Sequence, residues 1–117
     1  MGRIVHFELS SENPEVAAEF YGKAFGWAVM QFGEGSKWIA TTGDDHKPGI
    51  NGAIIQGDKS VRGVTNIIEV DSIDKAIFRV ESYGGKIVSP KTIIPNVGWI
   101  AYFEDPDGNV MGIMQTN

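Results

Sequence analysis

Hydrophobic and polar positions alternate strictly at the start of the chain. In the stretch RIVHFEL, residues 3–9, the odd-numbered positions from Val5 to Leu9 are all apolar. The even-numbered positions include His6 and Glu8. Because successive side chains of a strand point to opposite faces, the apolar face can pack under a helix. We therefore predict that His6 and Glu8 face the other side, toward a ligand cavity.

The pattern then changes to helical spacing. Asn13 can cap a helix, Pro14 suits its first turn, and Gly26 ends it. The apolar positions that recur three and four residues apart are Val16, Ala17, Phe20, Tyr21 and Ala24. Strand candidates follow over residues 27–32, 36–42 and 50–56, separated by the turn-rich sequences GEG and GDDHKPG. The first half is therefore predicted to be β-α-β-β-β.

The second half repeats this order. A strand is predicted over residues 63–70, and Ser72 can cap the helix that follows. The apolar stripe of this helix is Ile73, Ala76, Ile77, Val80 and Tyr83. Further strand candidates cover residues 86–90 and 91–95, which could form one bent strand, then 98–104 and 109–115. We predict a single domain, residues 1–117, made of two modules at about residues 1–60 and 61–117.

The sequence EDPDGN near the C-terminus has two interpretations. Its alternating acidic residues resemble the start of a calcium loop, but the sixth position counted from Asp105 is Val110 where such a loop needs glycine. A type I turn fits better, with Pro106 and Asp107 at its centre and Gly108 in the left-handed conformation that follows. The sequence therefore predicts a three-residue β-hairpin loop.

Composition and charge exclude several classes of protein. The 117 residues include no Cys, so neither a disulfide framework nor a thiolate site is available. The net charge is −5 and no cluster of basic residues occurs, which argues against nucleic-acid binding. No apolar run approaches the length of about 18 residues that a membrane helix needs, and no secretory signal is present. We expect a cytoplasmic protein with no membrane partner.

Three stretches together carry a resemblance to a known family: residues 5–27, residues 70–88 and YFEDPDGNVMGI at residues 102–113. In order and spacing the chain resembles the vicinal oxygen chelate superfamily of glyoxalases, extradiol dioxygenases and bleomycin-type resistance proteins. The resemblance implies an α+β fold in which two βαβββ modules form a curled open sheet around a cup-shaped cavity. It also implies a homodimer.

Enzymes of this superfamily hold a divalent metal with four side chains, typically His and Glu. The resemblance places these positions at His6, at or next to Gly52, at Thr65 or Asn66, and at Gly112. Because only His6 is a strong ligand, we expect no metal and no other cofactor. We also expect the two glycines to widen the cavity and to let a ligand approach the backbone.

Several side chains have more than one interpretation. His6 and Glu8 could be an acid–base pair, or a hydrogen-bonded polar pair that lines a wet pocket. Trp38 and Trp99 occupy corresponding strands of the two modules, so they are candidates for the pocket wall, although large aromatic residues usually belong to the core. His46 follows two aspartates in a loop, where a mobile polar loop is a simpler explanation than a metal site.

Three hypotheses for function follow. The first is a small-molecule binding protein with a degenerate metal site, with ligand contacts from His6, Glu8, Trp38, Gly52, Thr65, Trp99 and Gly112. The second is a metal-dependent lyase or isomerase of the glyoxalase type. The third is a metal-free isomerase or lyase in which His6 and Glu8 serve as catalytic acid and base. The ligand count favours the first hypothesis over the second.

Overall fold

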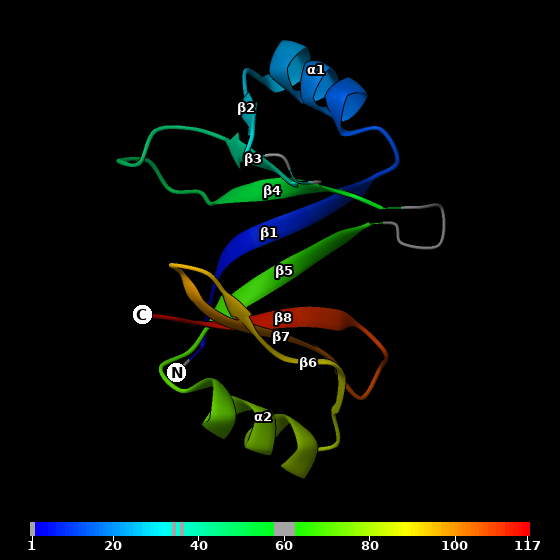
Figure 1. The fold of residues 1–117 in the computed structure, drawn as a ribbon, viewed down its shortest axis with the longest axis vertical. Coiled ribbons are helices and arrows are strands. Elements are labelled where there is room, and N and C mark those ends of the chain that lie inside the picture. Colours follow the sequence, from blue (N-terminus) through cyan, green and yellow to red (C-terminus); the bar gives the residue numbers. More distant parts are fainter. Residues whose placement is uncertain (1, 34, 36, 58–62) are drawn as a thin grey trace. The chain divides into compact units, whose positions relative to one another are not determined.

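The chain forms two compact units. The computed structural model describes residues 2–33, 35, 37–57 and 63–117. One unit comprises His6–Val64, and the other comprises Thr65–Asn117 together with the residues up to Val5 (Figure 1). Among the described residues, neither helix has the length and apolar content that crossing a membrane requires.

In its described residues, the unit His6–Val64 contains four strands and one helix. In chain order these elements are β1 (Arg3–Ser11), which begins in the other unit, α1 (Pro14–Phe25), β2 (Ala28–Gln31), β3 (Lys37–Thr41) and β4 (Asn51–Gln56). The strands are arranged β2-β3-β4-β1. The β1 and β4 strands pair in parallel, and the β2–β3 and β3–β4 pairs are antiparallel. The α1 helix is the crossover connection that leaves β1 (Figure 1).

The second unit repeats this topology. Its elements are β5 (Val64–Glu69), α2 (Ile73–Ser82), β6 (Lys86–Ile94), β7 (Gly98–Glu104) and β8 (Val110–Thr116). The strands are arranged β5-β8-β7-β6. As in the other unit, the first and last strands in chain order, β5 and β8, pair in parallel. The two strand candidates at residues 86–95 form the single strand β6, whose pairing with β7 is irregular between Ile87 and Thr92. The predicted α+β fold with two βαβββ modules is confirmed.

The N-terminal ends of both helices and the C-terminal end of α1 are where the sequence places them. Asn13 occupies the N-cap of α1, but its side chain makes no capping hydrogen bond. Gly26 ends α1 in the left-handed conformation with φ of 77°. The Ser72 hydroxyl oxygen caps α2 by accepting a hydrogen bond of 3.2 Å from the Lys75 amide.

The structure decides which of the two predicted apolar rows of α1 faces the sheet. Val16 and Phe20 are 62% and 58% exposed. The neighbouring row carries Tyr21, whose ring stacks on Trp27 with 4.6 Å between centroids, and Trp27 lies 5.7 Å from Phe7 of β1. The helix has two adjacent apolar rows, and only one of them can contact the sheet.

The core of the second unit lies between α2 and its strands. Its buried centre consists of Ile73, Ala101 and Ile113. Ile68, Val70, Ala76, Ile77, Trp99 and Phe103 pack around it. The predicted stripe of α2 is wrong at its end: Tyr83 is 82% exposed, because the helix ends at Ser82.

The β7–β8 connection is the predicted hairpin loop. The Asp105 amide donates to the Asn109 carbonyl and the Gly108 amide donates to the Asp105 carbonyl, both at 2.9 Å. Gly108 has φ of 89°, as the turn requires. One carboxylate oxygen of Asp105 accepts hydrogen bonds of 2.9 Å from the amides of Asp107 and Asn109. The pKa of the Asp105 carboxyl group is lowered. The largest cause is the hydrogen bond from the Asn109 side chain, and the next is the one from the Asn109 backbone amide.

Candidate functional site

His6 and Glu8 lie on the face of their sheet opposite to Phe7. In the parallel pairing of β1 with β4, His6 is opposite Asn51 and Glu8 is opposite Ala53. Paired residues share a face, so Asn51 joins His6 and Glu8 on it. Phe7 points the other way, toward Trp27 and the α1 side. The predicted alternation of these side chains about Phe7 is confirmed, whereas a ligand cavity on the side of His6 and Glu8 stays a prediction.

Lys37 adds a positive charge near this pair. It begins β3, where it pairs with Ile55, and Ile55 pairs with Ser10 of β1. Its face is therefore that of His6 and Glu8. We call His6, Glu8, Lys37 and Asn51 the His6 face.

Burial is the main reason why the pKa of His6 is lowered from 6.5. The Glu8 carboxylate acts in the opposite direction and raises this pKa, whereas the Lys37 ammonium lowers it further. The imidazole is therefore neutral at pH 7 and offers one donor and one acceptor nitrogen. A neutral imidazole of this kind can accept a proton or hydrogen-bond a polar ligand.

Asn51 is held in place by the loop that precedes its strand. Its side-chain oxygen accepts a hydrogen bond of 2.9 Å from the Thr42 amide, and the Thr42 hydroxyl donates to the Ile50 carbonyl at 2.6 Å. Asn51 and Lys37 were not predicted as site residues, because only the register between strands places Asn51 opposite His6 and puts Lys37 on the same face. The alternation of side chains within β3 and β4 was the sequence signal that could have indicated these two residues.

The two glycines at the predicted ligand positions do not open free space. A Cβ atom on Gly52 would lie 2.5 Å from the Phe7 carbonyl oxygen and 2.6 Å from the Phe7 ring. A Cβ atom on Gly112 would collide with the end of the Ile67 side chain and lie 3.2 Å from the Tyr102 ring. Neighbouring side chains fill both spaces, which differs from our expectation of a widened cavity.

Trp38 and Trp99 lie on helix-covered faces. Trp38 is opposite Ile54, which is opposite Leu9, so it shares the face of Phe7 rather than that of His6. Trp99 packs against the core under α2, and the Lys91 ammonium lies 4.4 Å from the centre of its ring. Both positions are typical of core packing and differ from the expected pair of pocket walls.

Thr65 lies on the face of its sheet that points away from α2. Ile68 packs on the α2 core, and residues an odd number of positions from it point to the other face. Thr65 and Ile67 therefore share that other face with Gly112, which pairs with Ile67. Asn66 is on the α2 side. The structure thus selects Thr65 of the two alternatives at this position.

The donor groups do not fit a divalent metal centre. Across the part of the chain that the structure describes, no three His, Cys, Asp or Glu side chains come together to hold a metal ion. Protein zinc sites normally use three or four such ligands. His46 is exposed in its loop, and its backbone amide donates a hydrogen bond of 3.0 Å to the Asp44 carboxylate.

Comparison with known proteins identifies the family. Residues 3–113 match the model of the Glyoxalase/Bleomycin resistance protein/Dioxygenase superfamily, and the chain belongs to this superfamily. It is 25% identical over 115 residues to CFP32 of Mycobacterium tuberculosis, a protein named as a candidate glyoxylase. The match covers 94% of this chain and 44% of CFP32, so the chain spans less than half the length of that relative.

Solved structures with the same fold include enzymes. Methylmalonyl-CoA epimerase from Mycobacterium tuberculosis is similar with a TM-score of 0.69 at 15% identity, over 97% of this chain and 87% of the epimerase. A member of the same superfamily from Vibrio splendidus 12B01 is similar with a TM-score of 0.68 at 18% identity, over 98% and 99% of the two chains. At these identities the likeness shows the fold alone.

Proposed function

We propose that this protein binds a small molecule at the His6 face without a resident metal ion. The observation that carries the proposal is the neutral His6 imidazole, which lies on one sheet face with the Glu8 carboxylate and the Lys37 ammonium. Together these groups offer a ligand a hydrogen-bond donor and acceptor and both signs of charge. Such a set fixes the orientation of a small polar ligand.

A binding assay with matched controls tests this proposal. A small-molecule library is screened by thermal shift, and each hit is retested on His6→Ala and Glu8→Ala. The controls are His46→Ala and Glu15→Ala, which change the same residue types at exposed positions. We expect hits to stabilise the wild type and both controls, and to lose at least about tenfold in affinity on the two site variants. Hits that bind all five proteins equally would contradict the proposal.

Elemental analysis tests the metal-free state. After dialysis against metal-free buffer we expect far less than one zinc, nickel or manganese ion per chain. About one ion per chain that disappears in His6→Ala would instead support the metal-dependent lyase or isomerase of the glyoxalase type.

A second candidate is a metal-free isomerase in which His6 removes a proton from carbon. The lowered pKa of His6 favours it, because a neutral imidazole is available as a general base at pH 7. A relative by fold is named as an epimerase, and epimerisation of this kind exchanges a C–H proton. Incubating each hit with the protein in D2O tests this candidate. Deuterium incorporation that His6→Ala abolishes would support catalysis. Binding without deuterium exchange would contradict the isomerase and support a binding function alone.

A further inference from the structure

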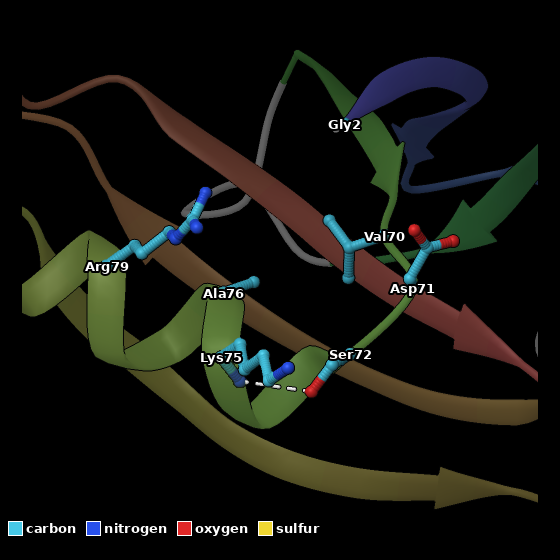
Figure 2. Close-up of a pocket in the computed structure, with 7 residues that line it drawn as sticks. All are labelled: Gly2, Val70, Asp71, Ser72, Lys75, Ala76 and Arg79. Carbon is cyan, nitrogen blue, oxygen red and sulfur yellow. Dashed lines mark hydrogen bonds between the residues drawn. The ribbon is translucent and has the colours of Figure 1, made fainter.

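A pocket of about 360 Å³ lies in the second unit at the start of α2 (Figure 2). Val70 and Ala76 form an apolar wall, and Lys75 and Arg79 line the pocket with positive charge. Small-molecule sites typically span about 300 to 1,000 Å³, so this pocket lies at the small end of that range. None of its residues belongs to the His6 face.

The two basic residues that line the pocket come from the same helix, α2. Lys75 and Arg79 are four residues apart on α2, which places them on the same side of the helix. Among the described residues neither side chain forms an ion pair, whereas Asp74 of the same helix is paired with Lys91 at 3.1 Å. Adjacent like charges repel, so an anion bound between Lys75 and Arg79 would relieve this repulsion.

Two of the backbone amides at the start of α2 already have hydrogen-bond acceptors. The Ile73 amide donates to the Gln115 side-chain oxygen at 2.9 Å, and the Lys75 amide donates to the Ser72 hydroxyl oxygen at 3.2 Å. With these two amides engaged, the groups that we assign to an anion in the pocket are the Lys75 and Arg79 side chains.

The acidic residue of the pocket fixes the orientation of a ligand. Figure 2 shows Asp71 at one end of the pocket and Arg79 at the other, with Val70 and Ala76 between them. An anionic group is repelled at the Asp71 end and attracted at the Arg79 end. A ligand that matches this arrangement has an anionic group at one end and a short hydrocarbon chain next to it.

We propose that this pocket binds a small organic carboxylate. Its carboxylate group pairs with the Arg79 guanidinium, whose planar fork matches the two carboxylate oxygens, and with the Lys75 ammonium. Its hydrocarbon chain lies on Val70 and Ala76. This site shares no residue with the His6 face, so the proposal does not depend on the function proposed there.

A titration with sodium butyrate tests the proposal. Binding to the ¹⁵N-labelled protein is followed through the amide signals of Val70 and Ala76 at constant ionic strength. We expect saturable shifts, and affinity about tenfold lower in Arg79→Ala and in Lys75→Ala. Asp71→Asn should strengthen binding, because it removes a repulsive charge. His6→Ala should leave the titration unchanged.

The matched control is Lys86→Ala, which removes one exposed lysine of the same unit and so changes the net charge equally. We expect it to bind butyrate as the wild type does. Shifts that do not saturate, or equal weakening in Lys86→Ala, would overturn the site. Inorganic phosphate forms the second arm: if it binds as tightly as butyrate, the apolar wall contributes nothing and the assignment to an organic carboxylate is wrong.

Discussion

At the scale of single residues, His6 is the group whose chemistry the fold changes most clearly. Its pKa is lowered chiefly by burial, against the opposing charge of Glu8 and with the help of Lys37. In the unfolded chain the imidazole returns to its ordinary pKa near 6.5. Between the folded and unfolded values the unfolded state binds more protons, so stability depends on pH there.

We predict that the free energy of unfolding falls as the pH is lowered from 6.5 through the folded pKa of His6. His6→Gln should remove this part of the pH dependence, which urea denaturation at a series of pH values measures. Lys37→Ala should raise the pKa of His6 and Glu8→Gln should lower it further, as followed by NMR titration of the imidazole. If Lys37→Ala leaves the His6 pKa unchanged, Lys37 is not close enough to belong to the site.

Gly52 and Gly112 differ in what an added Cβ atom would meet. A Cβ atom on Gly52 meets both the backbone oxygen and the ring of Phe7, and backbone cannot move aside cheaply. On Gly112 the collision is with the flexible end of Ile67. We therefore predict that Gly52→Ala destabilises the protein by about 1 to 3 kcal/mol, and Gly112→Ala by less. Urea denaturation of both variants measures the order, and the reverse order would contradict this account of the packing.

At the scale of elements, β1 separates the residues that stabilise the fold from those proposed to bind a ligand. Phe7 faces Trp27 and α1, whereas His6 and Glu8 lie on the opposite face. A strand with such different faces can change its ligand chemistry with little effect on packing. The two sets of residues should therefore respond differently to truncation.

We predict that Phe7→Ala lowers the free energy of unfolding by about 3 kcal/mol, as loss of a packed aromatic ring does. His6→Ala and Glu8→Ala should each cost on the order of 1 kcal/mol or less. Urea denaturation of the three variants decides the matter. Equal destabilisation by all three would mean that His6 and Glu8 serve the core rather than a ligand.

At the scale of the whole molecule, assembly stays a prediction. The resemblance to the superfamily implies a homodimer, and α1 leaves Val16 and Phe20 more than half exposed. Large apolar side chains that remain exposed in one chain are common at interfaces between chains. Light scattering should give twice the mass of one chain at micromolar concentration. A single-chain mass across the accessible concentration range would contradict the homodimer.

The sequence by itself determined the local structure. The helix ends at Ser72 and Gly26, the hairpin loop at residues 105–109 and the alternation of β1 were all predictable. Each depends on the conformational preference of one residue or on the period of a few neighbours. The family was also recognisable, because three short motifs occur in the right order.

Only the tertiary structure decided which of two possible faces α1 and β3 use. The two apolar rows of α1 are equivalent in the sequence, and contact with Trp27 selects the row of Tyr21 over that of Phe20. Strand register likewise places Asn51 opposite His6, puts Lys37 on the same face and turns Trp38 to the helix side. The physical reason is that register and burial depend on residues far apart in the chain, whereas local spacing fixes only the alternation of side chains.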